Sequence, residues 1–180
     1  NVHDISNPYF VSSILVNGLP GGLDIQDKCL FIATGYNGRD SSSTLTSPGY
    51  GMGNGMEIYD ISEPQSPKWL STSNIDGRYR NGSYDHWKVK VSGNYAYYSS
   101  IYDGIYIYDI SKPDSPKRVD HITIRIPNTS KNYHKNTNSN YVFPYDVDAF
   151  QQGPVMAYTL ADGCLYFADV YTGVYSYKAA

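Results

Sequence analysis

The chain has few of the residues on which most catalytic and metal-binding motifs depend. Its 180 residues include two cysteines and four histidines, and only 17% of them are charged. The sequence contains no G-x-S-x-G, H-E-x-x-H, C-x-x-C-H or G-x-x-x-x-G-K-[ST] pattern. It therefore offers no motif for the usual serine hydrolases, zinc proteases, c-type haem proteins or P-loop nucleotidases.

Large surface charge and long apolar runs are also missing. The formal net charge of −3 leaves no basic footprint for a nucleic acid, so no nucleic-acid partner is expected. No apolar run reaches the length that would span a membrane, so no membrane insertion is expected. Cys29 and Cys164 are too few for a disulfide framework and fall in repeat units that are not adjacent, which predicts buried free thiols.

Tyrosine is what the chain has in abundance, with 20 Tyr against 5 Phe. Tyrosine favours strands and combines an apolar ring with a polar tip. The remaining polarity comes mostly from Ser, Asn, Thr and Gly rather than from charge. This composition is typical of an all-β chain that is extracellular, on the cell surface or periplasmic.

A repeated stretch organises the sequence: GIYIYDISKPDSPK at 104–117 has a twin, GMEIYDISEPQSPK, at 55–68. A shortened copy, VHDISNP, lies at 2–8. Residues 104–109 alternate with period two, which predicts a strand with bulk on both faces, placed between two neighbouring sheets. The proline-containing segment that follows cannot continue a ladder and predicts a turn. Asp60 and Asp109 recur just before this turn, which favours a structural role for both.

A hairpin precedes the stretch, with Gly93-Asn94 as a tight turn between two alternating runs at 87–98. One unit is therefore four short antiparallel strands. The Asp of the D-I-S motif recurs at 4, 60 and 109, and repeats of about 40–50 residues with four strands are typical of β-propeller blades. We predict an all-β, partial β-propeller domain over 1–180, with about three four-stranded antiparallel blades. It is expected to be a fragment of a larger propeller, with closure by a homo-oligomer or larger assembly as the alternative.

The pattern N-Y-A-Y, then D-G-I-Y-I-Y-D-I-S-x-P-x-x-P, resembles the LVIVD-repeat family of bacterial and archaeal surface β-propellers. The resemblance covers 85–120 well, 22–68 less fully and 145–180 loosely. It implies a propeller fold and a surface location. It does not imply an activity, because propellers host both binding proteins and enzymes.

Strand assignment is less direct at the two ends of the sequence. We expect residues 1–7 to finish one strand, 9–16 to form an outer strand and 18–22 to form a turn. In the last unit, 162–169 matches 93–100 and makes 173–177 a third strand, which is the preferred register. The same segment also matches 103–109, which would shift the last unit by one strand.

Two long insertions, at about 35–55 and 126–144, interrupt the repeats. The second is rich in Asn with interspersed aromatic residues, a composition typical of recognition loops. The glycines near 49–55 do not form a dinucleotide or P-loop pattern. We predict a protein- or glycan-binding or structural interaction module whose partner contacts the insertions and the 73–85 connection. The residues expected to make this contact are Tyr79, Arg80, Tyr133, His134, Tyr141 and Phe143.

An enzyme is the less favoured alternative, with a site at the mouth of the propeller channel. It would use His86, Lys88 or Asp146 with a metal or cofactor completed by further blades. Asp146 and Asp148 lie two apart on one strand face, where paired carboxylates suit Ca²⁺ or acid–base chemistry. No D-x-D-x-D-G loop completes such a cage, so no cofactor is predicted and only a structural Ca²⁺ is left open.

Overall fold

The computed structural model describes residues 6–16, 18–35, 55–74, 86–100, 104–122, 155–169 and 173–178. These residues form strands, turns and extended segments, and no helix among them is long and apolar enough to span a membrane. The first sheet contains β1 (Leu19–Gln26), β2 (Cys29–Gly35), β3 (Gly55–Asp60) and β4 (Lys68–Asn74). The middle sheet contains β5 (His86–Ser92), β6 (Tyr95–Ser100), β7 (Gly104–Asp109) and β8 (Lys117–Ile122). The third sheet contains β9 (Val155–Ala161), β10 (Cys164–Asp169) and β11 (Gly173–Lys178).

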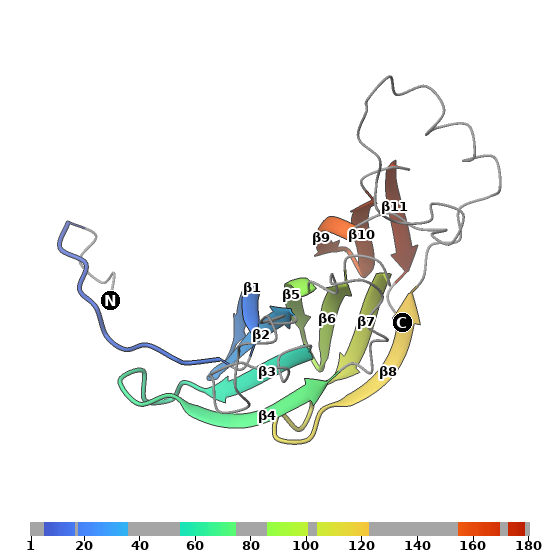
Figure 1. The fold of residues 1–180 in the computed structure, drawn as a ribbon. Coiled ribbons are helices and arrows are strands. Elements are labelled where there is room, and N and C mark those ends of the chain that lie inside the picture. The colour runs from blue at the N-terminus through green and yellow to red at the C-terminus, as the bar shows by residue number, and fades with distance from the viewer. Residues whose placement is uncertain are drawn as a thin grey trace, which may run out of the picture.

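Within each sheet the strands follow one another in chain order, and every neighbouring pair is antiparallel. The sheets are arranged like a fan, with β1, β5 and β9 on the inner side and β4 and β8 along the outer curve (Figure 1). The inner strand β5 packs on β1 and β2 and also contacts β9. The predicted all-β class is confirmed, and the arrangement is consistent with successive blades of a propeller.

Strand β7 of the middle sheet is buried on both faces, as the alternation in 104–109 predicts. Ile105 and Ile107 belong to the core shared with the third sheet. Tyr106 and Tyr108, together with Ile110, belong to the core shared with the first sheet. Burying a side chain of this size contributes about 1.5–3 kcal/mol. These two inter-sheet cores therefore hold the three sheets together.

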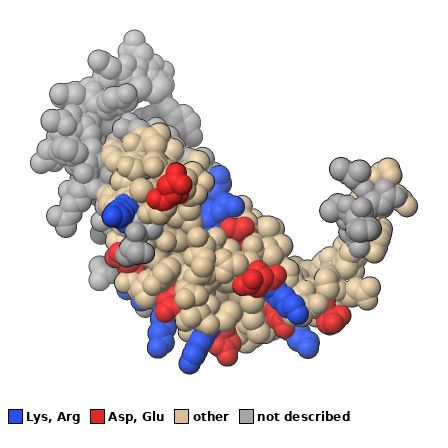
Figure 2. Space-filling view, turned by 180° about the vertical axis from the view of Figure 1, so that it is seen from behind, with Lys and Arg blue, Asp and Glu red and all other residues tan. Residues whose placement is uncertain are grey.

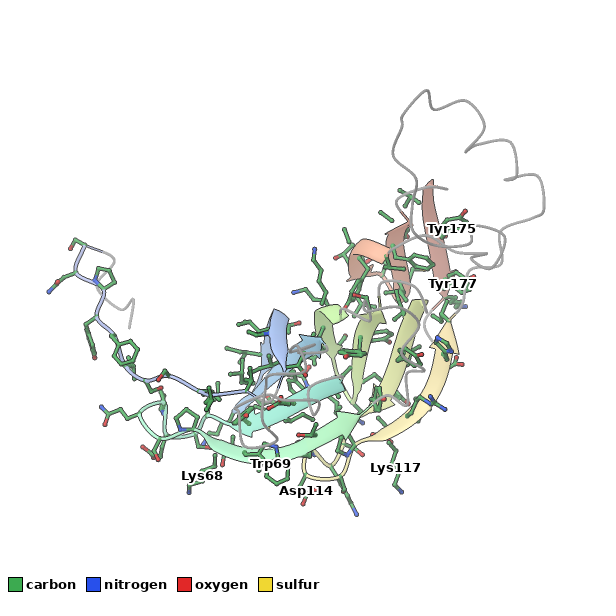
Figure 3. All side chains as sticks on the ribbon, in the orientation of Figure 1. Lys68, Trp69, Asp114, Lys117, Tyr175 and Tyr177 are labelled. Atoms are coloured by element: carbon green, nitrogen blue, oxygen red, sulfur yellow. The ribbon has the colours of Figure 1, made fainter. Side chains whose placement is uncertain are left out.

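Each core draws its residues from two adjacent sheets. The core between the first and middle sheets is formed by Phe31, Ala33, Met56, Ile58, Val89, Ala96, Tyr98, Tyr106, Tyr108 and Ile110. The core between the middle and third sheets is formed by Tyr97, Ile105, Val155, Tyr158, Leu165 and Phe167. On β11, Tyr175 and Tyr177, labelled in Figure 3, both stack on Phe167.

The D-I-S motif closes its turn through the aspartate side chain. Oδ1 of Asp60 accepts a hydrogen bond from the N–H of Ser62 at 2.8 Å, and Oδ1 of Asp109 accepts one from Ser111 at 2.9 Å. Hydrogen bonds from the side chain and backbone of Ser62 lower the pKa of Asp60. Those from the backbone and side chain of Ser111 lower the pKa of Asp109. The predicted structural role of both aspartates is confirmed.

The isoleucine of the motif joins this turn to the preceding hairpin. The N–H of Ile61 donates to the carbonyl of Lys28, and the N–H of Ile110 donates to the carbonyl of Asn94, each at 2.8 Å. Lys28 and Asn94 occupy the same position in the two-residue turns of their sheets. In the first and middle sheets, the motif therefore joins the D-I-S turn to the hairpin turn at the same end of the sheet.

The predicted hairpin turn at Gly93-Asn94 is present, the other two sheets have a two-residue turn at the same position, and each turn begins with a left-handed residue. Asp27, Gly93 and Asp162 have φ of 55°, 57° and 50°, as tight two-residue hairpin turns require. A Cβ added at Gly93 would meet no heavy atom within 4 Å, so a substitution there tests backbone conformation without a clash.

Two predictions near the N-terminus are wrong, and the first of them is the strand at 9–16. Residues 8–16 form no strand and run beyond the body of the sheets as an extended segment (Figure 1). A strand requires a neighbour with which to pair, and the described residues place none beside this segment. The segment contacts the first sheet through Ser12, whose Oγ donates to the carbonyl of Pro64 at 2.6 Å.

Residues 18–22 do not form the predicted turn, because β1 begins at Leu19. The register shifts between Pro20 and Gly22, which pair with Thr34 and Ala33. An edge strand with such a bulge tolerates proline, because the missing N–H leaves no partner unpaired. In the last unit, β10 and β11 follow the preferred register, with β11 as the third strand.

We predict that Gly93→Ala lowers the free energy of unfolding by about 1–2 kcal/mol, because alanine resists the left-handed conformation. Gly93→Asn should cost less, since asparagine tolerates this region. Chemical denaturation of both variants measures the difference. Equal destabilisation by the two substitutions would contradict a backbone origin.

We also predict that Asp60→Asn combined with Asp109→Asn flattens the acid side of the stability profile. The folded-state pKa values of these aspartates lie below their unfolded values. Their contribution is therefore present at neutral pH and is lost as the pH falls through the folded-state values. Thermal melts across the acid range measure this dependence. Glu63→Gln removes one charge from the same turn without touching the hydrogen bonds of Asp60 and Asp109, and is the matched control.

Candidate functional site

All three long connections join strand ends at one end of the sheets, which we call the connection end. Antiparallel order dictates this placement, since β2, β4 and β8 run toward that end and β3, β5 and β9 start from it. The connections are 36–54, 75–85 and 123–154. The opposite end, which we call the turn end, carries the two-residue hairpin turns and the D-I-S turns. A rigid scaffold that presents its longest connections from one end is a common basis for binding sites.

Buried hydroxyl groups support the base of the first long connection. Tyr98 of the middle sheet donates its hydroxyl hydrogen bond to the carbonyl of Gly55 at 2.7 Å. Thr34 Oγ1 donates to the same carbonyl at 3.0 Å. Tyr98 and Thr34 are fully buried. Because Thr34 and Gly55 lie on either side of the connection 36–54, the middle sheet holds both strand ends from which that connection departs.

A similar contact joins the middle and third sheets. The hydroxyl of Tyr158 donates to the carbonyl of Tyr97 at 2.7 Å. Burial raises the pKa of Tyr98 and Tyr158 well above the ordinary tyrosine value. Both phenols therefore stay protonated at neutral pH and act as hydrogen-bond donors. Their role in this geometry is to join sheets.

The first sheet buries one carboxylate, Glu57, completely. The hydroxyl of Tyr59 donates to its Oε2 at 2.8 Å. Burial, followed by the hydrogen bond to Glu57 and its charge, raises the pKa of Tyr59. Glu57 lies on the face turned away from the middle sheet, since Met56 and Ile58 on either side of it belong to the shared core. This carboxylate therefore already has a hydrogen-bonded partner inside the protein.

Polar groups also join the inner strands of the first and middle sheets. Asp24 Oδ2 accepts a hydrogen bond from the N–H of Val91 at 3.0 Å and lies 3.5 Å from Lys90 Nζ. Gln26 Nε2 donates to the carbonyl of Gly93 at 2.7 Å. The ion pair is partly exposed and contributes less than about 1 kcal/mol. Asp24 therefore acts chiefly as a backbone acceptor that aligns β1 with β5.

Most of the predicted site residues lie outside the described residues. These are Tyr79, Arg80, Tyr133, His134, Tyr141, Phe143, Asp146 and Asp148. They belong to the connections 75–85 and 123–154, whose flanking strands all end or start at the connection end. The structure thus brings the origins of these connections to one end, and the contacts of the eight side chains stay predictions.

The predicted channel residues are only partly described. His86 begins β5 and pairs with Ser100 on β6. Lys88, two residues further along, is exposed. In the ranges that the structure describes, no group of three His, Cys, Asp or Glu residues lies close enough to hold a metal ion.

Cys29 and Cys164 are free, as predicted, but they are half-buried rather than buried. Burial, and then the charges of Asp60 and Asp27, raise the pKa of the Cys29 thiol. The two cysteines open β2 and β10, so they occupy the same position in the first and third sheets. The middle sheet lies between them.

Sequence reasoning missed the inter-sheet hydrogen bonds of Tyr98, Tyr158 and Asp24. One signal was available for the two tyrosines, because each stands where a core-facing position of a strand usually has a purely apolar residue. A buried phenol usually has a hydrogen-bond partner, so Tyr98 and Tyr158 each indicated an acceptor across the core. Which carbonyl accepts the bond depends on how the sheets pack.

Charges of both signs are interspersed on the face shown in Figure 2. Along the outer curve, Lys68, Trp69, Asp114 and Lys117 point away from the sheets (Figure 3). Lys68 and Lys117 begin the outer strands β4 and β8. Lysines on an edge strand oppose pairing with another chain, which protects this curve from aggregation.

These features define a repeat-containing, propeller-like module made of antiparallel sheets. Residues 85–122 match the LVIVD repeat, and this match spans the whole middle sheet. The chain therefore carries an LVIVD repeat, as the resemblance at 85–120 indicated. None of the curated proteins that were compared matches the chain.

We predict that Tyr98→Phe lowers the free energy of unfolding by about 1 kcal/mol, because one buried hydrogen bond is lost. Gly55 keeps its bond from Thr34, so Thr34→Val combined with Tyr98→Phe should cost more than the sum of the two single substitutions. Chemical denaturation of the two single variants and the double variant measures this coupling. Strict additivity would show that the two hydroxyls do not share the acceptor.

Proposed function

We propose that the chain is a binding module that works outside the cytoplasm, on the cell surface or in the extracellular or periplasmic space. It holds a protein or glycan at the connection end. The observation that carries this proposal is the departure of all three long connections from one end of a rigid stack. The repeated sheets supply the scaffold, and the connections supply the chemistry that differs from one repeat to the next.

The scaffold at this end is well suited to hold connections in place. Tyr98 and Thr34 fix Gly55 at the base of the first connection. Val155, which follows the third connection, is buried in the core between the middle and third sheets, and Ile122 before it packs on that core. Both connections therefore begin and end at buried positions. Binding a partner then costs little conformational entropy at the bases of these connections, because the bases are already ordered.

The composition of the connections supports a protein or glycan rather than a charged partner. Tyrosine and asparagine supply rigid aromatic area and adaptable hydrogen bonds, the combination found in recognition loops. Tyr133, His134, Tyr141 and Phe143 give the third connection four ring-bearing side chains within a short stretch. Tyr79 and Arg80 place a further ring and a guanidinium in the second connection.

Two of the three long connections, 36–54 and 123–154, have a shorter counterpart at the same position of another sheet, which allows a direct test. The position of 36–54 between β2 and β3 corresponds to that of 101–103 between β6 and β7. Likewise, the position of 123–154 corresponds to that of 75–85. Replacing each long connection by its shorter counterpart should leave the melting transition of the sheets in place. It should weaken binding to a panel of immobilised glycans and purified cell-surface proteins at least tenfold, although Tyr79 and Arg80 remain.

Single substitutions refine this test. Tyr133→Ala and Tyr141→Ala should each weaken binding by tenfold or more, because aromatic anchors carry a large share of interface energy. Tyr95→Ala serves as the matched control, since this half-exposed tyrosine lies at the turn end. Binding that is unchanged after both replacements, or that Tyr95→Ala abolishes, would overturn the proposal.

A further inference from the structure

A β-bulge in the outer strand β8 brings two basic side chains onto one face of the middle sheet. Arg118 pairs with Tyr108 of β7, and His121 pairs with Tyr106. The register shifts between these two pairs and leaves Val119 as the extra residue of the bulge. Residues three apart on a regular strand point to opposite faces, so the bulge is what places Arg118 and His121 on the same face. Since Tyr106 and Tyr108 belong to the core with the first sheet, this face is turned toward that sheet.

Two buried tyrosine rings hold these basic side chains in place. The imidazole of His121 stacks on Tyr106, with ring centroids 4.0 Å apart and ring planes 3° from parallel. The guanidinium carbon Cζ of Arg118 lies 5.8 Å from the centroid of the same ring. Burial raises the pKa of Tyr108, and the nearby charge of Arg118 opposes this rise. The guanidinium therefore lies close to both tyrosines, which are fixed by the core, while Arg118 itself stays exposed.

The charge of Arg118 is not neutralised by a carboxylate of the described residues. The ion pair found in this part of the chain joins Asp24 to Lys90 and does not include Arg118. Asp120 is the acidic residue nearest to Arg118 in β8, but it lies on the opposite face of the strand. There its Oδ1 accepts a hydrogen bond from the N–H of His121 at 2.7 Å. Arg118 thus offers a fork of N–H donors, which matches the geometry of an oxyanion.

The bulge belongs to the repeat, whereas the side chains that it brings together differ from sheet to sheet. In the first sheet the register shifts at the matching place, between Ile58 and Tyr59. There the bulge brings Trp69 beside Thr72, and Nε1 of Trp69 donates to Oγ1 of Thr72 at 3.1 Å. The same backbone geometry therefore carries a neutral pair in the first sheet and a basic pair in the middle sheet.

The basic pair lies at the foot of the third connection. Strand β8 follows the outer curve of the sheets and runs toward the connection end (Figure 1). The connection 123–154 departs directly after Ile122, so His121 is the last residue but one of the strand that leads into it. A ligand held by this connection lies beside the exposed face of Arg118 and His121.

We propose that Arg118, with His121 beside it, binds the oxyanion of an acidic saccharide, either a uronate carboxylate or a sulfate ester. This inference rests on the proposed function and names the class of glycan that is held at the connection end. The guanidinium binds the oxyanion through charge-assisted hydrogen bonds, and the imidazole adds a second polar group on the same face. The rings and amides of the third connection contact the neutral part of the same ligand.

Titration of the full chain with three matched sugars tests the proposal. The probes are methyl β-glucuronide, methyl β-glucoside 6-sulfate and the neutral methyl β-glucoside, and binding is followed by the NMR signals of the β8 amides. At least one acidic sugar should bind about tenfold more tightly than the neutral one, as a hydrogen-bonded charge pair predicts. The tighter of the two acidic sugars identifies the oxyanion.

Substitutions on the two faces of β8 separate the fork from net charge. Arg118→Gln should weaken binding of the acidic sugar about tenfold and leave binding of the neutral sugar unchanged. Arg118→Lys keeps the charge without the fork and should restore only part of the affinity. Lys117→Gln removes the same charge from the opposite face, where Lys117 pairs with Asp109, and should change neither affinity. Each variant should keep the circular dichroism of the wild type, because both substituted side chains are exposed.

The outcomes distinguish this inference from the proposed function. Equal binding of acidic and neutral sugars overturns the inference alone, because a glycan is still bound. Equal weakening by Arg118→Gln and Lys117→Gln also overturns it, because net charge then accounts for the preference. If a protein partner binds and none of the sugars does, the inference fails and the function remains protein binding. If neither sugars nor proteins bind, both fail.

Discussion

Burial of the central strands β6 and β7 of the middle sheet on both faces is the constraint on which the rest of the structure depends. A strand in this position must present bulk on each side, and backbone carbonyls of the neighbouring sheet also accept hydrogen bonds across the core. Tyrosine satisfies both requirements, because its ring fills the core and its hydroxyl reaches the next sheet. Tyr98 and Tyr158 do this at the two junctions.

The sequence predicted most of the fold where the signal is local. The alternation at 104–109 and the turn at Gly93-Asn94 depend on residues that are neighbours in the chain, and both predictions are confirmed. The errors at 9–16 and 18–22 have a different cause. Whether an extended segment becomes a strand depends on a partner far away in the sequence, and whether Pro20 ends a strand depends on its place at a sheet edge.

The candidate site was predictable in part. Long insertions could be recognised from their length and composition, but their common origin at one end follows from antiparallel order and appears only when every strand is assigned. The acceptors of Asp24 and Tyr98 depend on how closely neighbouring sheets approach and in what register. No residue pattern within one repeat encodes that distance. The side chains proposed to contact a partner belong to connections whose two ends are described. The contacts of these side chains lie outside the described residues.

The hydroxyls of Tyr98 and Tyr158 each point back to a main-chain carbonyl of the preceding sheet. A carbonyl is supplied by every residue, so the preceding sheet needs no particular side chain to receive this bond. A gene duplication that adds one repeat would therefore carry its own donor and find an acceptor already in place. For this bond, a change in repeat number requires no compensating mutation in the neighbouring repeat.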